Sequence, residues 1–287
     1  MSTTATTPRQ QPLREPGGRL ARVLRFPLTW MLIGLLGVGV VAGLTAQGPG
    51  VVPVLGAAVA LVVYRVVMRV VAGRRTPELA RRGAVSEALS GAAVGLGFVA
   101  VAAAVVAALG GYSFSPADDV DLLAVVGPVL AVAVGGAVTE ELTFRGFALQ
   151  ALERLLGSWV ALALTALMFG LSHLLNPGAT VWSTLAIAIE AGGLLGAAFL
   201  WRRNLWFAIA LHVAWNGAVA LLGIPVSGHV APGLLVADVA GPSLLTGGAF
   251  GIEGSVVTVA LSVLLTVPML LLARRRGTLV PARGPRP

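Results

Sequence analysis

Long apolar stretches follow one another along most of the chain, and they limit its fold more than any other feature. Eight of them approach the length of about 20 residues that a helix needs to cross the hydrocarbon core of a membrane. Only 11% of the residues are charged, compared with about 25% in soluble domains. The sequence therefore predicts an all-α fold, a polytopic transmembrane helical bundle of about eight spans. The expected spans are residues 26–46, 51–72, 85–110, 120–144, 158–175, 181–201, 205–222 and 255–273.

The arginines indicate how this bundle lies in the cell membrane. All 20 basic residues are arginines, and those between spans gather on one side when the spans alternate. That side includes both termini, whereas the other side receives Asp118, Asp119 and Asp121 and no arginine. By the positive-inside rule, both termini are expected in the cytoplasm. Because the clusters are short and flank spans, the net charge of +8 is an orientation signal and predicts a lipid bilayer, not a nucleic acid, as partner.

The segments outside the spans predict the domain organisation. Residues 1–25 are rich in proline and arginine and are expected to be a disordered cytoplasmic N-terminus without a removable signal peptide. Residues 26–273 form one transmembrane domain, and residues 274–287 form a cytoplasmic tail. The Gly- and Pro-rich segment 223–254 is expected to be an external loop. The chain has no cysteine, which excludes thiol catalysis, disulfides and cysteine-ligated zinc.

Two glutamates and an arginine at the end of the fourth apolar stretch are the first sign of chemistry. Charged residues inside a span are costly and are usually functional. Glu141 and Arg145 are four residues apart, so on a helix they share a face and can pair. Glu140 points about 100° away from Glu141 and remains free to face a cavity. Alternatively, both glutamates are the solvated cytoplasmic end of the span.

A histidine follows in the next apolar stretch, where Phe169-x-x-x-His173 ends the predicted span. Glu140 precedes the possible turn at 156–158 by about as many residues as His173 follows it. If that turn joins a helical hairpin, the two side chains lie at the same height. A carboxylate and an imidazole side by side can share a water molecule and remove its proton. The alternative is a packed or interfacial histidine with no catalytic role.

His212 and Asn216 form a third polar pair, again four residues apart and on one helix face. Both can donate hydrogen bonds, as an oxyanion hole requires. The alternative is a hydrogen bond between two helices, a common use of these residues in membranes. Helix geometry puts His212 about 12 Å from its cytoplasmic turn and Glu140 about 25 Å from its own. The two depths agree only if helix 145–156 projects into the cytoplasm or tilts strongly.

Glu190, near the middle of the sixth span, is a further intramembrane carboxylate. It could be a second partner for Arg145, line a cavity, or be protonated and hydrogen-bonded, and we favour a structural role. His229, in the predicted external loop, is expected to be solvated.

Taken together, the three motifs resemble those of the CPBP family, which includes the CAAX prenyl proteases and bacteriocin-processing enzymes. The resemblance covers about residues 120–222 and implies an intramembrane protease domain within residues 26–273. It implies hydrolysis of a peptide bond in a membrane-associated protein or peptide. The matching motifs are Glu140-Glu141-x-x-x-Arg145, Phe169-x-x-x-His173 and His212-x-x-x-Asn216.

The resemblance also implies a role for each motif residue. Glu140 would be the catalytic glutamate and would work with His173 to activate water. His212 and Asn216 would hold the oxyanion. The residues that orient the site would be Glu141 and Arg145.

Metal dependence is open at this point, because relatives have been described both as metalloproteases and as metal-independent glutamate proteases. Zinc would be held by Glu140, His173 and His212. Catalytic zinc usually takes three firm protein ligands, and we favour a site without a tightly bound metal.

Two other functions compete with proteolysis. A non-catalytic scaffold or bacteriocin self-immunity factor of the same fold would be expected to lack some catalytic residues, but all the motif residues are present. A transporter could use Glu140, Glu190 and His173 as a proton or ion path. That reading predicts related halves, and the sequence shows no such repeat.

Overall fold

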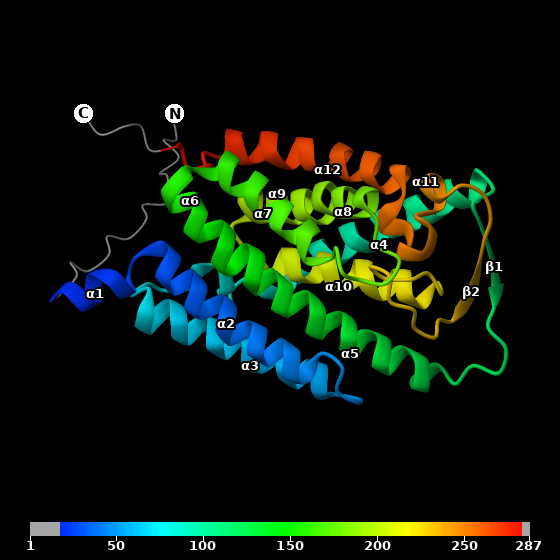
Figure 1. The fold of residues 1–287 in the computed structure, drawn as a ribbon, viewed down its shortest axis with the longest axis horizontal. Helices are drawn as coiled ribbons and strands as arrows, with labels where there is room; N and C mark the ends of the chain where they lie inside the picture. The colour runs from blue at the N-terminus through cyan, green and yellow to red at the C-terminus, as the bar shows by residue number, and fades with distance from the viewer. Residues whose placement is uncertain (1–17, 283–287) are drawn as a thin grey trace.

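The computed structural model describes residues 18–282 as a bundle of helices with one small sheet at one end (Figure 1). The predicted all-α membrane bundle is confirmed. The α-helices are α1 Gly18–Leu24, α2 Pro27–Thr45, α3 Val52–Val66, α4 Ala84–Ala108, α5 Leu122–Glu141, α6 Gln150–Leu156, α7 Ser158–Ser172, α8 Val181–Ile187, α9 Leu194–Arg202, α10 Leu205–Leu221, α11 Ser243–Thr246 and α12 Val256–Arg275. The π-helical segments are η1 Val67–Val71, η3 Leu142–Leu149 and η4 Ala188–Gly193, and the 3-10 turns are η2 Pro77–Leu79, η5 Gly248–Phe250 and η6 Ile252–Gly254.

Helices occupy the positions of all eight predicted spans. Among the described residues, six helices are long and apolar enough to cross a membrane, and two further apolar helices, α7 and α10, are shorter. The chain is therefore a multi-pass membrane protein. The six long helices are Pro27–Thr45, Val52–Val71, Ala84–Ala108, Leu122–Leu156, Val181–Arg202 and Val256–Arg275.

The two terminal segments differ in part from what the sequence suggests. Of the N-terminal segment 1–25, residues 1–17 lie outside the described residues, and Gly18–Leu24 forms the short, exposed helix α1. At the other end the described part of the tail folds back onto the bundle. Thr278 Oγ1 donates to the Leu200 carbonyl at 2.7 Å, and Ser158 N donates to the Val280 carbonyl at 2.9 Å.

The helix that begins the motif core is much longer than the predicted span 120–144. It is continuous over the 35 residues Leu122–Leu156, as α5, η3 and α6. A helix of that length measures about 52 Å at 1.5 Å per residue, whereas the hydrocarbon core is about 30 Å thick. It must therefore project from the membrane, tilt, or do both, which is the condition that the depths of Glu140 and His212 required. Figure 1 shows it crossing the molecule from end to end.

Local signals in the sequence fix both ends of this helix. Asp121 caps its start, because the side chain accepts hydrogen bonds from Leu123 N at 3.0 Å and Ala124 N at 3.3 Å. Gly157 ends it in a left-handed conformation, with φ of 80°, which glycine adopts at little cost. Because α7 begins at the next residue, the predicted helical hairpin at 156–158 is confirmed.

Small residues let α4 approach α10, the helix that has the third motif. A Cβ atom on Gly91 would lie 2.2 Å from the Phe207 carbonyl oxygen, and one on Gly95 would lie 2.4 Å from the Leu211 carbonyl oxygen. These glycines face α10 with their backbones almost in contact, a common form of helix packing in membranes. Gly91 and Gly95 therefore allow α4 to pack closely against the helix that has His212.

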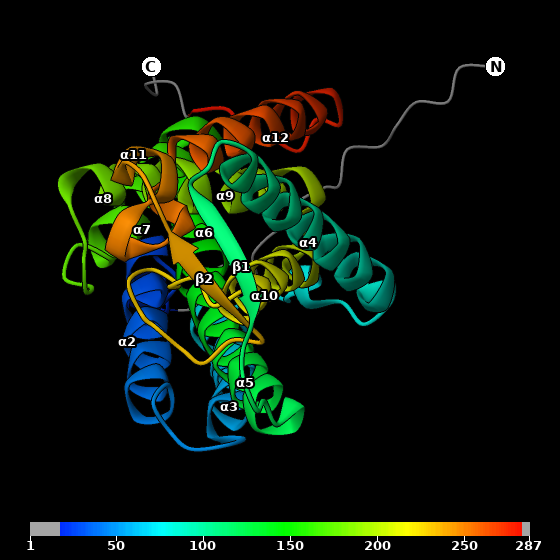
Figure 2. The ribbon, with the colours of Figure 1, turned by 90° about the vertical axis from the view of Figure 1, so that its right-hand side faces the viewer.

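The segment 223–254 is folded, and it pairs with the segment before α5. Strand β1 Tyr112–Pro116 runs antiparallel to β2 Leu235–Val239, with Tyr112 opposite Val239. Figure 2 looks at this end of the molecule and shows the two strands crossing in front of the helices. After β2 the chain turns inward, and Phe250 and Ile252 join a buried apolar cluster. The sequence did not indicate this small sheet.

Candidate active site

The first and third motifs meet at one carboxylate oxygen. Glu141 Oε1 accepts a hydrogen bond from Arg145 Nη1 at 2.8 Å and another from His212 Nδ1 at 3.0 Å. The side chains of Glu141, Arg145 and His212 are 0%, 2% and 5% exposed. The predicted pairing of Glu141 with Arg145 is thus present, and it extends to a histidine 71 residues further along the chain. Removing one member of such a buried group leaves the others with an uncompensated charge.

Arg145 also joins the motif helix to the span that has Glu190. Its Nη2 atom donates to the carbonyl oxygens of Ala191 at 2.7 Å and Gly192 at 3.3 Å. Its guanidinium carbon lies 4.9 Å from the centre of the Phe169 ring, within range of a cation–π contact. Arg145 and both carbonyls belong to π-helical segments, η3 and η4, which often mark functional positions in helices. No hydrogen bond joins Arg145 to Glu190 within residues 18–282.

Glu140 differs from its neighbour in exposure. Its side chain is 33% exposed, whereas that of Glu141 is fully buried. Glu140 Oε2 lies 3.8 Å from His212 Nε2, too far for a hydrogen bond. One atom of a substrate or of water can still reach hydrogen-bonding distance of both groups. The structure therefore brings Glu140, Glu141, Arg145 and His212 into a single cluster, with Glu140 on its accessible side.

His173 reaches this cluster through an aromatic side chain. The Phe169 ring lies 4.7 Å from the His173 ring and 6.3 Å from the His212 ring, measured between centres. His173 Nδ1 is 2.8 Å from the Phe169 carbonyl oxygen, which can only accept. Nδ1 therefore has the proton, and Nε2 of the neutral ring keeps its lone pair. The structure joins His173 to His212 through the Phe169 ring and shows no hydrogen bond from His173 to Glu140 in the described part of the chain.

Asn216 lies one helical turn after His212 on α10 and is half-buried. Its side chain forms no hydrogen bond with any described residue. A tie between helices would need such a bond, so the amide is available for another partner. Its role in holding an oxyanion stays a prediction.

The segment 223–254 brings a further carboxylate to the site. Glu253, in η6, is 3% exposed. Its Oε2 atom accepts hydrogen bonds from the backbone N of Ser227 and, at 2.9 Å, from the Ser227 hydroxyl. Burial raises the pKa of the Glu253 carboxyl, while the hydrogen bonds from Ser227 oppose that rise, as do His173 and His212 in their protonated forms. None of the three sequence motifs includes Glu253.

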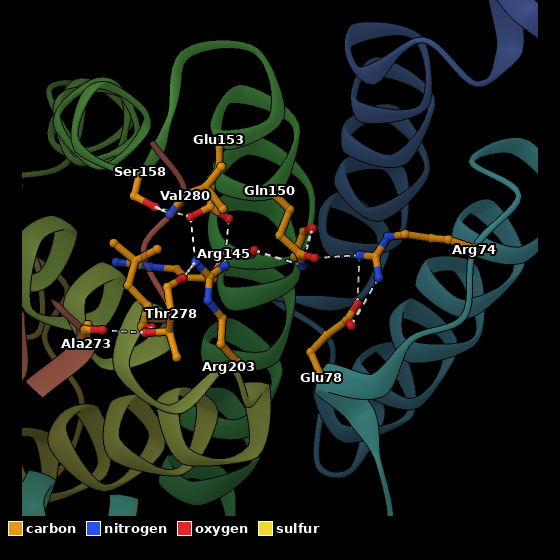
Figure 3. Close-up of polar contacts among 12 residues, drawn as sticks. Arg74, Glu78, Arg145, Gln150, Glu153, Ser158, Arg203, Ala273, Thr278 and Val280 are labelled. Atoms are coloured by element: carbon orange, nitrogen blue, oxygen red, sulfur yellow. Dashed lines mark hydrogen bonds and ion pairs between the residues drawn. The ribbon is translucent and has the colours of Figure 1, made fainter. Parts of the chain in front are cut away.

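A hydrogen-bond network anchors the motif helix on the side away from the sheet (Figure 3). Gln150 Nε2 donates to the carbonyl oxygens of Gly146 at 2.8 Å and Arg145 at 3.2 Å, both in η3. Arg74 in turn donates to Gln150 Oε1 at 2.6 Å and pairs with Glu78 at 2.9 Å. This network fixes the backbone from which the Arg145 side chain extends.

A second anchor joins the same helix to the start of α10. Glu153 accepts two hydrogen bonds from Arg203, each of 2.6 Å, and a further one from the Ser158 hydroxyl. Asn204 then caps α10 by accepting from Trp206 N at 2.8 Å. Figure 3 shows Arg203 reaching across to Glu153. The helices that have the first and third motifs are thus fixed to each other next to the turn from which α10 starts.

A metal ion needs several donor side chains around one point. Within residues 18–282, no three His, Cys, Asp or Glu side chains stand close enough to hold one ion. His212 Nδ1 is bonded to Glu141, and His173 Nδ1 is bonded to a carbonyl. The three residues named as possible zinc ligands do not form a preassembled zinc site, which would need its ligands about 2 Å from one point.

These features define a class of protein, a polytopic helical membrane protein with a buried Glu–Arg–His cluster beside a partly exposed carboxylate. Residues 122–218, about a third of the chain, match the family model described as type II CAAX prenyl endopeptidase Rce1-like. This match agrees with the resemblance noted from the three motifs, and it runs from the start of α5 into α10. The matched segment contains every motif residue, whereas Glu253 lies outside it. Comparisons with curated proteins and with solved structures gave no match.

Proposed function

We propose that this protein is an intramembrane endopeptidase that hydrolyses a peptide bond of a membrane-associated protein or peptide. The family match supports the protease class. The proposal depends most on the contrast between two adjacent glutamates. Glu141 is fully buried and paired, whereas Glu140 is 33% exposed and faces His212 Nε2 across 3.8 Å. A carboxylate in that position can act as the general base for a water molecule.

In the proposed reaction Glu140 takes a proton from water while the water oxygen attacks the carbonyl carbon of the scissile bond. The carbonyl oxygen becomes an oxyanion, which His212 Nε2 and the Asn216 amide stabilise. Protonated Glu140 then gives its proton to the leaving nitrogen, and the C–N bond breaks. One water is consumed, a carboxyl group and an amine are formed, and Glu140 regains its charge.

The two histidines have different parts in this scheme. His212 Nδ1 is bonded to Glu141, so only Nε2 is directed at the substrate. Nε2 donates a hydrogen bond to an oxyanion when the His212 ring has both protons. The ring lies between the carboxylates of Glu140 and Glu141, which allow this doubly protonated form. His173 has its proton on Nδ1 and a lone pair on Nε2. In the proposal His173 Nε2 accepts a hydrogen bond from the attacking water and so helps Glu140 to orient it.

The substrate class follows from the membrane and the family. The family's description concerns CAAX prenyl endopeptidases, so a lipid-modified peptide is one candidate. A bacteriocin precursor is another, in line with the resemblance to processing enzymes. Both are peptides held at a membrane. We propose that both termini of the protease are cytoplasmic, which puts the anchored end of the motif helix on the cytoplasmic side.

No step in this scheme uses a metal ion. We therefore expect purified protein to keep its activity after extraction with a chelator. Stoichiometric zinc whose removal stops cleavage would replace the proposed water activation with a metal-dependent one.

The proposal can be tested without knowing the substrate. Membrane proteomes would be compared between cells that produce the wild-type protein and cells that produce Glu140→Gln at the same level. Glu87→Gln is the matched control, because Glu87 pairs with Arg202 at 2.6 Å, away from the motif residues. We expect fragments that occur with the wild type and with Glu87→Gln but not with Glu140→Gln. Identical proteomes in all three would favour a non-catalytic membrane factor.

A further inference from the structure

Glu190 and Glu253 are two buried carboxyl groups for which the proposed reaction has no use. Glu190 is 0% exposed and belongs to η4, and Glu253 is 3% exposed and belongs to η6. Both belong to one packed region, because η6 leads directly into α12 and α12 packs against η4. Two such carboxylates cannot both be charged without a large cost in a low-dielectric interior.

The hydrogen bonds of the two groups are unequal. Neither carboxyl oxygen of Glu190 has a hydrogen-bond partner among the described residues. Thr258, on the neighbouring turn of α12, donates its hydroxyl proton to the carbonyls of Ile252 and Ser255 instead. Glu253, by contrast, accepts two hydrogen bonds from Ser227. Hydrogen bonds to a carboxylate stabilise its charged form, and burial without them favours the neutral acid.

A chain of contacts connects Glu253 to the end of α7 that has His173. Asn176 N donates to the His173 carbonyl at 3.1 Å, and the Asn176 side chain donates to the Ser227 carbonyl at 2.9 Å. Ser227 then donates to Glu253. The backbones fit tightly here, since a Cβ atom on Gly228 would lie 1.9 Å from the Pro177 carbonyl oxygen. The position of Glu253 is thus tied to that of His173.

Other ionisable groups also face Glu253. They are His173, which directly follows α7, His212 on α10 and Glu190 in η4, each of which interacts electrostatically with Glu253. Tyr112, on β1, is the fourth, and its pKa is raised by burial and then by the charge of Glu253. Among these groups His212, whose ring has both protons in the proposed reaction, can balance a negative charge on Glu253.

We propose that Glu190 and Glu253 form an acid–carboxylate pair behind the histidines, in which Glu190 has the proton and Glu253 has the charge. Glu253 then acts as a positioning residue that holds His173 through Ser227 and Asn176 and supplies a negative charge near its ring. This role in the site rests on the proposed protease function, whereas the pair itself does not.

Infrared spectroscopy tests the pair without any substrate. Full-length protein in lipid nanodiscs at neutral pH should show a carbonyl band of a protonated carboxylic acid. Glu190→Gln should remove that band, and Glu253→Gln should keep it. Absence of the band from the wild type, its survival in Glu190→Gln, or its loss from Glu253→Gln would each overturn the assignment.

Histidine spectra test the link to the site. The chain has three histidines, so protein labelled only at histidine gives three sets of imidazole signals, which single His→Gln variants can assign. Glu253→Gln should shift the His173 signals, whereas Glu253→Asp, which keeps the charge, and Glu190→Gln should leave them near the wild-type position. His229 is exposed and its backbone bridges Val226, so unchanged His229 signals show that the segment is still folded. An unmoved His173 signal in a folded Glu253→Gln protein would refute the positioning role.

Cleavage assays then separate this inference from the proposed function. If the protein is a protease, Glu253→Gln should change the pH profile of cleavage and Glu190→Gln should not. Loss of all cleavage in Glu140→Gln together with unchanged pH profiles in both variants would leave the protease function standing and remove Glu253 from the site. If no cleavage occurs at all, the infrared and histidine spectra still test the proposed acid–carboxylate pair of Glu190 and Glu253.

Discussion

At the scale of single residues, the site depends on two neighbouring glutamates in different surroundings. Glu141 shares one oxygen between Arg145 and His212, and all three side chains are buried. Glu140 is partly exposed and makes no hydrogen bond of its own with the described residues. The same side chain at adjacent positions therefore has a structural role at one position and a proposed catalytic role at the other.

This contrast predicts opposite phenotypes for the same substitution. Glu140→Gln should abolish cleavage and leave thermal stability nearly unchanged, because no buried partner loses its charge. Glu141→Gln should lower stability by about 3 kcal/mol, since breaking a buried ion pair leaves Arg145 uncompensated. Thermal unfolding in detergent, run beside the cleavage assay, measures both effects. Reversed phenotypes would mean that the two roles have been exchanged.

Asn216 gives a second residue-scale prediction. Asn216→Ala should lower kcat by about 10²–10³-fold with little change in KM, as the loss of an oxyanion donor does. Stability should hardly change, because the amide makes no hydrogen bond within residues 18–282. A variant that unfolds easily but cleaves at a normal rate per folded molecule would show that Asn216 ties helices together instead.

The raised pKa of the Glu253 carboxyl predicts how the stability of the protein depends on pH. Burial raises the pKa of its carboxyl, so the folded state binds this proton more tightly than the unfolded state. The resulting stability is fully present below the unfolded pKa of about 4.3 and is lost as the pH rises through the folded value. The glutamine of Glu253→Gln cannot ionise. As the pH rises, the unfolding temperature of the wild type should therefore fall relative to that of Glu253→Gln. A difference that stays constant with pH would mean that the pKa of Glu253 is not raised.

At the scale of elements, close packing between α4 and α10 holds the third motif in place. A Cβ atom on Gly95 would lie 2.4 Å from the Leu211 carbonyl oxygen, next to His212 in the chain. Gly95→Val should therefore cost about 2 kcal/mol or more, within the range of overpacked sites, and should also lower activity by moving α10. Gly97→Val is the control, because a Cβ atom there meets nothing within 4 Å. Equal unfolding temperatures for the two variants would contradict the packing.

The elements also show what could be predicted from the sequence. Apolar length is a local signal, and it located all eight helices. Gly157 and the spacing around it predicted the hairpin, and the separation of Glu141 from Arg145 predicted their pair. The predicted span was shorter than the observed 35-residue helix. The C-terminal part of this helix includes the polar residues Gln150, Glu153 and Arg154, and it is buried by segments that are distant in the sequence.

Other parts of the site depend on contacts between distant segments. The sharing of Glu141 with His212 spans 71 residues, and no local pattern specifies it. Glu253 lies in a segment rich in glycine, where the apolar residues follow neither helix nor strand period. Its one signal is an acid directly after Ile252 and close to Phe250, two residues of the kind that pack in a core. The pairing of β1 with β2 joins short strands more than 100 residues apart and was missed for the same reason.

At the scale of the whole molecule, the two ends differ in charge and in construction. One end has the anchoring networks of Arg74 and Arg203 and the folded tail, and the other has the two-stranded sheet. The arginine distribution predicts that the first end is cytoplasmic. Reporter fusions after Arg82 and after Arg276 should therefore read as cytoplasmic, and a fusion near Ser243 as external. An external reading at either arginine would overturn the orientation.

Isotope labelling tests directly whether Glu140 activates water for peptide hydrolysis. Membranes with wild-type protein or Glu140→Gln, which must be folded and present in equal amounts, would be incubated in ¹⁸O-water. New C-termini would then be identified by mass spectrometry. We predict new peptide C-termini that contain ¹⁸O with the wild type and none with Glu140→Gln. The same labelled termini in both samples would contradict the proposed role of Glu140.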